Sequence, residues 1–145
     1  GYHEVAITAQ AMLQAVGINA QIEVLDWATQ LQNYLTGNYQ IQSFAYSSRL
    51  DPAIAYSSII GDKAKSPSVS WEDPTAMKLL DAAKQTMDPA PRTRLFEQIH
   101  TRMADAVPVI GLYNDVRVVA TAASLQGYKP WSAGFDRFWG VTKAE

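Results

Sequence analysis

The sequence contains no cysteine among its 145 residues, and this absence excludes several kinds of site at once. Without thiols the chain has no disulfides, no thiolate metal ligands and no cysteine nucleophile. Histidine is almost as scarce, because His3 and His100 are the two present and they lie far apart in sequence. No H-x-x-x-H pair or carboxylate cluster has the spacing of metal ligands. The composition therefore predicts no metal centre and no thiol enzyme.

Long runs of basic residues and long runs of apolar residues are also missing. The sequence has no basic run, and a formal net charge of -2 gives no general reason to bind nucleic acid. No apolar stretch approaches the roughly 20 residues that cross a bilayer, and no signal peptide stands at the N-terminus. The sequence opens without Met on a helical pattern already under way, so we expect a piece of a longer protein. The missing signal therefore says nothing about export.

Motifs of common enzymes are absent as well. Neither G-x-G-x-x-G nor a P-loop occurs, so no glycine-rich phosphate cradle is predicted. Serines are plentiful, but there is no G-x-S-x-G elbow and no cue that pairs one with a histidine. A serine hydrolase would need His3 or His100 within hydrogen-bond reach of Ser47 or Ser48. The sequence therefore gives no support for a serine hydrolase or for a glycine-rich phosphate site.

What is present is the pattern of one folded domain over residues 1–145. The content of 48% hydrophobic and 18% charged residues is ordinary for a folded protein. Apolar residues at helical spacing predict a first helix that ends at Gly17. Asp26 can cap a second helix, which carries Trp27 and Tyr34 on its core face and ends near Gly37. Two further helices begin at Asp73-Pro74 and Asp88-Pro89, and the latter closes at Pro108.

Five segments read as strands. Residues 18–24 alternate apolar and polar side chains, which is typical of a half-buried strand. Residues 39–46 are a second predicted strand, with Ile41, Ser43 and Ala45 on one face and Gln42, Phe44 and Tyr46 on the other. The stretches VPVIGLYN, VRVVAT and FDRFWGV add three more. Helices alternate with the first strands at the spacing of parallel βαβ units. The predicted fold class is α/β, with a mixed, partly parallel sheet flanked by helices.

The stretch YSSRLDPA follows the second predicted strand, where α/β sheets place their ligands. The guanidinium of Arg49 can hold a carboxylate through two parallel hydrogen bonds, and Ser47 and Ser48 can add hydroxyls. The alternative is a local surface pair between Arg49 and Asp51, which contributes little. Asp51-Pro52 starts a helix on either interpretation.

Aromatic residues in loops leave a second question open. Trp71, Trp131, Phe135 and Trp139 lie in or beside loops, where rings line binding surfaces or pack at the edge of a core. If Trp131 and Trp139 are exposed, the chain could instead act as a docking or oligomerising domain.

The order of several segments resembles a known family. AQAMLQAVGINAQIEVLDW, GNYQIQSFAYSSRLDP, DPAPRTRLFEQIHTRMADAVPVIGLYN and LQGYKPW follow one another as in the C-terminal lobe of the bacterial extracellular solute-binding proteins of family 5. Those proteins bind peptides, nickel or opines and serve ABC importers. No single motif is diagnostic, but the ordered set covers nearly the whole chain.

The resemblance implies one lobe of a two-lobed periplasmic-binding-protein fold that closes on its ligand by hinge motion. This chain would be the C-terminal ligand-binding lobe, with the last ~20 residues returning toward the hinge. The implied partners are a small peptide-like or anionic solute, the ABC permease subunits and an N-terminal lobe outside this sequence. The implied location is the periplasm, or a lipid anchor outside the membrane. No catalysis and no cofactor follow.

The resemblance also implies roles for particular residues. Ser48 stands where peptide binders of the family often carry the aspartate that receives the ligand's amino group, and Ala45 replaces their usual tryptophan. Arg49 is similar to members that read W-S-G-R-x-D-P, which suggests that this lobe holds a ligand carboxylate. Tyr46 would supply an apolar wall, while Ser47 and Ser48 hydrogen-bond to the solute.

The resemblance concerns three further residues: two at the end of a later predicted strand and one arginine at the start of a helix. Tyr113 and Asn114 end the predicted strand VPVIGLYN and are further candidates for lining the cleft. Arg92 matches the arginine that the family carries at the start of a helix, and we interpret it as structural.

Overall fold

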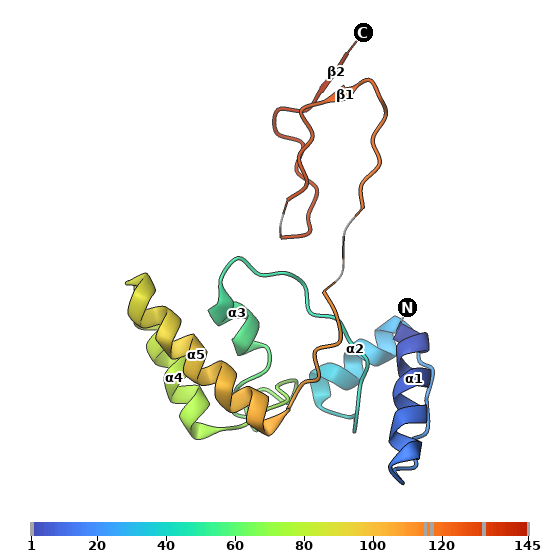
Figure 1. Cartoon of the computed structure of the whole chain (residues 1–145), viewed down its shortest axis with the longest axis vertical. Helices are drawn as coiled ribbons and strands as arrows, with labels where there is room; N and C mark the ends of the chain where they lie inside the picture. Colours follow the sequence, from blue (N-terminus) through green and yellow to red (C-terminus); the bar gives the residue numbers. More distant parts are fainter. Residues whose placement is uncertain (1, 115, 117, 132, 145) are drawn as a thin grey trace.

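The computed structural model describes residues 2–114, 116, 118–131 and 133–144. Within them, α3, α4 and α5 gather on one side, α1 lies on the opposite side, and α2 lies between (Figure 1). A small antiparallel sheet stands apart from the helices, at the end of an extended connection. The elements are α1 (Tyr2–Ala15), α2 (Trp27–Thr36), α3 (Pro52–Ser57), α4 (Pro74–Gln85), α5 (Pro89–Ala106), β1 (Leu125–Gln126) and β2 (Thr142–Lys143).

Aspartate caps begin four of the helices, as the sequence predicted. The carboxylate of Asp26 accepts a hydrogen bond from the backbone N–H of Thr29 at 3.0 Å, and that of Asp73 accepts one from Ala76 at 2.7 Å. Asp51 and Asp88 cap α3 and α5 in the same way, and proline follows the cap in α3, α4 and α5. Each carboxylate satisfies a backbone donor that has no partner within the helix.

The helix ends divide into two kinds. Gly17 (φ 84°) and Gly37 (φ 71°) adopt the left-handed conformation after α1 and α2, which confirms the predicted ends. Helix α5 ends differently, because Val107 takes φ 48° and ψ 50° directly before Pro108. A β-branched side chain is disfavoured in this region, since its Cβ crowds the following carbonyl. The α5 terminus is therefore a strained position.

The buried core lies among α3, α4 and α5. Leu80 of α4 is 2% exposed and Ile99 of α5 is fully buried, as their predicted apolar stripes require. A short parallel bridge closes the loop 61–70 beside this core, where the N–H of Trp71 donates to the carbonyl of Ile59 at 2.9 Å. The core cluster consists of Ala53, Ile60, Ala76, Leu80 and Ile99. The helical hairpin of α4 and α5 is thus the best-packed part of the described chain.

No ladder forms over the described residues of the predicted strands. Within the described ranges, residues 18–24 and 39–46 are irregular chain, with bends at residues 40 and 41, and pair with no other strand. The ladder that is present joins Leu125 to Lys143 and Gln126 to Thr142, so β2 begins directly after FDRFWGV. Arg117, inside VRVVAT, lies outside the described residues. The mixed, partly parallel sheet stays a prediction, because a sheet requires neighbours that these segments do not have here.

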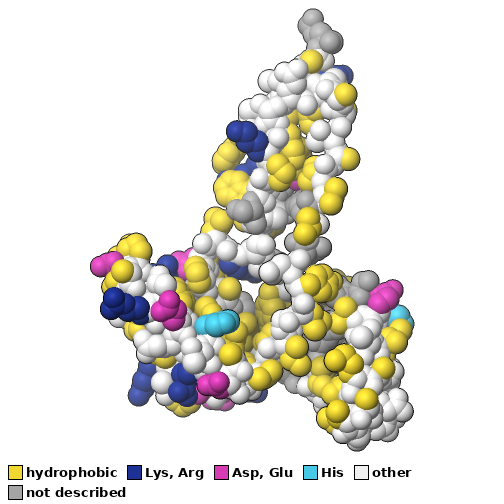
Figure 2. Space-filling view, in the orientation of Figure 1, with side chains coloured by type: hydrophobic (Ala, Val, Ile, Leu, Met, Phe, Trp, Pro, Cys, Tyr) yellow, Lys and Arg dark blue, Asp and Glu magenta, His cyan; other side chains and the backbone are white. Residues whose placement is uncertain are grey.

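Charge is distributed unevenly over the surface. Acidic and basic side chains concentrate over the α4–α5 hairpin, while the face around α1 is mostly apolar and uncharged (Figure 2). Among residues that the structure describes, no helix combines the length and the hydrophobicity needed to cross a bilayer.

Candidate ligand-binding site

Five aromatic rings surround the start of the predicted site. Phe44 is the central ring, which stacks on Trp27 with centroids 5.6 Å apart and on Tyr34 with centroids 4.7 Å apart. Tyr46 and Phe44 meet edge to face with centroids 5.8 Å apart, and Tyr39 stacks on Tyr34 with centroids 6.5 Å apart. We call these five residues the aromatic cluster. Offset and edge contacts of this kind stabilise ring pairs beyond the area that they bury.

Local sequence spacing explains how the aromatic cluster forms. Trp27 and Tyr34 are separated by two helical turns and so share a face of α2. Phe44 and Tyr46 are two residues apart in irregular chain, and the contact between their rings places both on the same side of it. Two side-chain hydrogen bonds hold this chain against α2: Gln30 Nε2 donates to the carbonyl of Ser43 at 2.7 Å, and Gln42 Nε2 donates to the carbonyl of Gln30 at 2.9 Å.

Tyr46 has one packed side and one side in solvent. Desolvation raises the pKa of its hydroxyl well above the ordinary value, and the nearby Tyr34 hydroxyl raises it further. The residue nevertheless keeps 43% of its surface exposed. A neutral phenol that is packed along one edge can present its other edge to a ligand as an apolar wall.

The three residues that follow the aromatic cluster are exposed. Ser47, Ser48 and Arg49 lie in irregular chain between Tyr46 and the start of α3. In the described part of the chain, no hydrogen bond or ion pair engages the Arg49 guanidinium. Its N–H donors are therefore available to an external acceptor.

Asp51 does not pair with Arg49. It binds Arg92, whose Nη2 donates to both carboxylate oxygens at 2.8 Å. The N–H of Ala53 also donates to Asp51 at 2.8 Å, and this hydrogen bond followed by that from Arg92 lowers the pKa of the Asp51 carboxyl. The predicted alternative of a local Arg49–Asp51 pair is therefore wrong.

Arg92 joins three helices, which confirms its predicted structural role. Besides Asp51 at the start of α3, its Nε donates to the carbonyl of Ala83 in α4 at 2.9 Å. Its guanidinium also lies 5.2 Å from the ring centroid of Phe96 within α5. These contacts use both the edge and the face of the guanidinium group.

Tyr113 and Asn114 are exposed residues in the irregular chain after α5, and Tyr113 is 67% exposed. Across the described residues, no hydrogen bond or ring contact links either one to residues 46–49. The structure thus brings Tyr46 together with the aromatic cluster but does not join Tyr113 or Asn114 to it.

Surface pockets occur away from the predicted site residues. One lies between α4 and α5 and is lined by residues that include Leu79, Arg94 and Thr101. The other lies in the C-terminal segment around Trp131 and Trp139. Neither is lined by Tyr46, Ser47, Ser48, Arg49, Tyr113 or Asn114.

The histidines give no sign of a catalytic pair. His3 lies on α1 and His100 on α5, and both are exposed. No hydrogen bond between a histidine and a serine occurs among the described residues, nor do three or more His, Asp or Glu side chains there gather as metal ligands would. The absence of enzymatic activity stays a prediction.

Sequence reasoning missed four rings of the aromatic cluster. Trp27 and Tyr34 were assigned to the core, yet Trp27 is 57% exposed and stacks on Phe44 at the surface. The spacing of Phe44 and Tyr46 on one face of extended chain was the available signal. It would have linked Tyr46 to an aromatic surface before the fold was known.

Comparison with known proteins gives a distant relative. Over 131 residues the chain is 24% identical to the oligopeptide-binding protein AppA of Bacillus subtilis (strain 168). The match covers 87% of this chain and 24% of the length of AppA, so the chain spans about a quarter of this relative. No family profile and no solved structure matches the chain. The sequence is therefore similar, at low identity, to part of an oligopeptide-binding protein.

Proposed function

We propose that this chain is the ligand-binding C-terminal lobe of an extracellular solute-binding protein, the component of an ABC importer that captures solute. Its ligand is a small peptide-like or carboxylate-bearing solute. The proposal is supported by the distant similarity to an oligopeptide-binding protein and by the ordered family motifs. In this proposal the protein works in the periplasm or on a lipid anchor outside the membrane. Its partners are the permease subunits and an N-terminal lobe.

The observation that carries the proposal is the pairing of Asp51 with Arg92. Because Asp51 is engaged by Arg92, the nearby Arg49 retains its hydrogen-bond donors beside an exposed aromatic wall. A guanidinium in this position matches a carboxylate in charge and in bidentate geometry. Tyr46 then contacts the apolar part of the solute, while Ser47 and Ser48 supply hydroxyls to its polar atoms.

The proposed lobe includes the mixed sheet that the sequence predicts. Residues 18–24 and 39–46 are irregular chain that places apolar side chains in solvent; Val24 is 74% exposed and Ile41 is 79% exposed. Their backbone N–H and C=O groups are suited to pairing with neighbouring strands. Amide hydrogen exchange on the assembled two-lobed protein tests this point, because ladder formation predicts slow exchange in both segments.

A second candidate function is a docking or oligomerising domain, favoured by exposed rings near the C-terminus. Phe135 is 68% exposed, Phe138 is 65% exposed and Trp139 is 80% exposed. Apolar surface of this kind marks interaction sites in many proteins. Sedimentation at increasing concentration distinguishes the two functions, since association abolished by Trp139→Ser would favour docking.

Mass spectrometry of ligand that co-purifies with the protein tests the proposed function. We expect a bound peptide or another carboxylate-bearing solute, released on denaturation. The Arg49→Ala variant should lose it, whereas Arg94→Ala, an exposed arginine on α5, should retain it. A protein that carries no such solute and binds none from a peptide mixture would contradict the proposal.

A further inference from the structure

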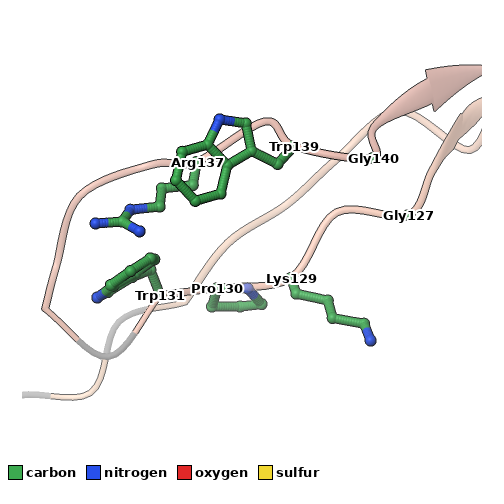
Figure 3. Close-up of a pocket in the computed structure, with 7 residues that line it drawn as sticks. All are labelled: Gly127, Lys129, Pro130, Trp131, Arg137, Trp139 and Gly140. Atoms are coloured by element: carbon green, nitrogen blue, oxygen red, sulfur yellow. The ribbon is translucent and has the colours of Figure 1, made fainter.

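A second cationic site lies in the C-terminal segment, remote in sequence from residues 46–49. Figure 3 shows the Arg137 side chain between the rings of Trp131 and Trp139. Its guanidinium carbon lies over the ring of Trp131 and 4.8 Å from the ring centroid of Trp139. The two indole rings meet edge to face, with centroids 6.5 Å apart and planes at 75°. They border a pocket of about 690 Å³, and Figure 3 shows Pro130 and Lys129 following Trp131 along one side of it, with Arg137 and Trp139 on the other.

The charges around this pocket favour an anion. Its lining contains Lys129 and Arg137 but no acidic side chain. The adjacent carboxylate of Asp136 accepts a hydrogen bond from Tyr128 Oη at 2.7 Å. Over the described residues, no ion pair engages Arg137. The Lys129 side chain points away from Arg137, so it adds positive potential at the rim but no direct contact to the guanidinium (Figure 3).

The geometry of the stack determines which part of Arg137 a ligand can reach. The Trp131 ring lies against the guanidinium and the Trp139 ring approaches it with its centroid 4.8 Å away, as in cation–π contacts. The guanidinium N–H donors lie in the plane of the group and point outward along the uncovered edge. An edge of this kind accepts a carboxylate through two parallel hydrogen bonds. Stacking therefore orients the guanidinium before any ligand arrives, which reduces the entropy lost on binding.

An unsatisfied donor lies in the same place. The indole Nε1 of Trp131 is buried and has no hydrogen-bond partner among the residues that the structure describes. A buried donor without an acceptor costs free energy, about 1–3 kcal/mol in typical cases. In Figure 3 this nitrogen and the guanidinium of Arg137 lie at the same end of the stack. One carboxylate at that end could engage both groups.

We infer that the pocket of Trp131, Arg137 and Trp139 binds a carboxylate, either of a small free acid or of a peptide C-terminus. Arg137 supplies the charge and the paired donors, Trp131 and Trp139 fix its orientation, and Trp131 Nε1 donates a further hydrogen bond. The inference does not depend on the proposed function of Arg49.

Nuclear magnetic resonance of the indole N–H groups tests this site. The chain has four tryptophans, so a ¹⁵N-labelled sample gives four indole cross-peaks, and Trp131→Phe identifies the relevant one. Titration with trialanine should shift the Trp131 peak to saturation, while trialanine amide should not, because it lacks the carboxylate. Acetate serves as the free acid. A saturable shift with acetate and trialanine assigns the site to any carboxylate, and a shift with trialanine alone assigns it to a peptide terminus.

Variants then separate binding from structure. Arg137→Gln should weaken the trialanine response by roughly tenfold or more, because the charge and the paired donors are lost. Arg49→Ala should leave the Trp131 response unchanged. Lys129→Gln leaves the stack of Trp131, Arg137 and Trp139 in place and should weaken trialanine binding only slightly. This variant tests the contribution of charge at the rim even if Arg137→Gln disorders the segment. No saturable shift with trialanine or acetate, an equal shift with trialanine amide, or full binding by Arg137→Gln would overturn the inference.

Discussion

Asp51 and Arg92, 41 residues apart in sequence, are joined by two hydrogen bonds of 2.8 Å from one guanidinium nitrogen. The pair connects the start of α3 to the first turn of α5, and the contact of Arg92 with Ala83 includes α4. The pair also leaves the positive charge of Arg49 unneutralised, because the Asp51 carboxylate is bound to Arg92 instead. The same interaction therefore supports the helical core and the proposed ligand site.

Replacement of Arg92 by Ala should lower the free energy of unfolding by about 2 kcal/mol, since hydrogen bonds to charged groups contribute about 1.5–3 kcal/mol. The free energy of unfolding of Arg92→Lys should lie between those of the parent and Arg92→Ala, because an ammonium group cannot make the contacts with Asp51, Ala83 and Phe96 at the same time. Urea denaturation measures these differences. Arg94→Ala is the matched control on the same helix and should change stability by about 0.5 kcal/mol or less. Equal stabilities of the Arg92 and Arg94 variants would show that Arg92 does not join the helices.

Stability should fall in acid because several aspartates, among them Asp51 and Asp73, are held in their charged forms. The hydrogen bond from Arg102 and that from the Ala76 N–H lower the pKa of Asp73, and Asp51 is lowered by Ala53 and Arg92. A lowered pKa in the folded state stabilises the protein above the unfolded value, near 3.8, and this contribution is lost as pH falls through the folded pKa. Melting temperatures between pH 6 and pH 2 measure the loss.

The double variant Asp51→Asn/Asp73→Asn is the control for this pH dependence. It should be less stable than the parent near neutral pH, and its melting temperature should change less as the pH falls below 4. Identical pH profiles for the parent and the variant would mean that neither carboxylate contributes to acid sensitivity.

Phe44 is the ring on which the aromatic cluster depends, so Phe44→Leu should disrupt it. The loss of stacking on Trp27 and Tyr34 should cost about 1 kcal/mol and reduce the near-ultraviolet circular dichroism. The pKa of Tyr46 should also fall toward its ordinary value of 10.0, because the hydroxyl becomes more hydrated. Spectrophotometric titration of tyrosine follows that change. Tyr113→Leu is the control at an exposed tyrosine and should change neither the stability nor the pKa of Tyr46. An unchanged Tyr46 pKa in Phe44→Leu would contradict the packing of Tyr46 against Phe44.

Val107→Gly should stabilise the protein by about 1 kcal/mol. Glycine adopts the left-handed conformation without the Cβ clash that valine has there, and this gain exceeds the added entropy of the unfolded chain. Val107 is 56% exposed, so little packing is lost. Thermal denaturation is the measurement. Ile110→Gly, at an exposed position without positive φ, should not stabilise; a destabilised Val107→Gly would show that the valine side chain matters more than its backbone strain.

Local chemistry made the helices predictable from the sequence. Asp73-Pro74 and Asp88-Pro89 each combine a side-chain acceptor with a preset backbone angle, so helix starts could be located without tertiary information. Gly17 and Gly37 marked helix ends for the same reason. The apolar stripes correctly identified Leu80 and Ile99 as core residues, since helical periodicity alone determines which residues share a face.

Contacts between distant residues could not be predicted in this way. Spacing offered Arg49 as the partner of Asp51, but the packing of α5 against α3 and α4 brings Arg92 there instead. The stack of Trp131, Arg137 and Trp139 likewise depends on a chain reversal that no local pattern encodes. For the sheet, alternation in residues 18–24 predicts extended chain but does not say which strand pairs with it.

Calorimetric titration of trialanine into the assembled two-lobed protein tests the proposed role of Arg49 most directly. An Arg137→Gln background removes the second carboxylate site, and trialanine amide serves as the matched ligand without a carboxylate. We expect Arg49→Ala to weaken trialanine binding by about 2–5 kcal/mol, as for loss of a desolvated charged partner, and to leave binding of the amide nearly unchanged. Equal affinities of the parent and Arg49→Ala for trialanine would contradict a carboxylate contact at Arg49.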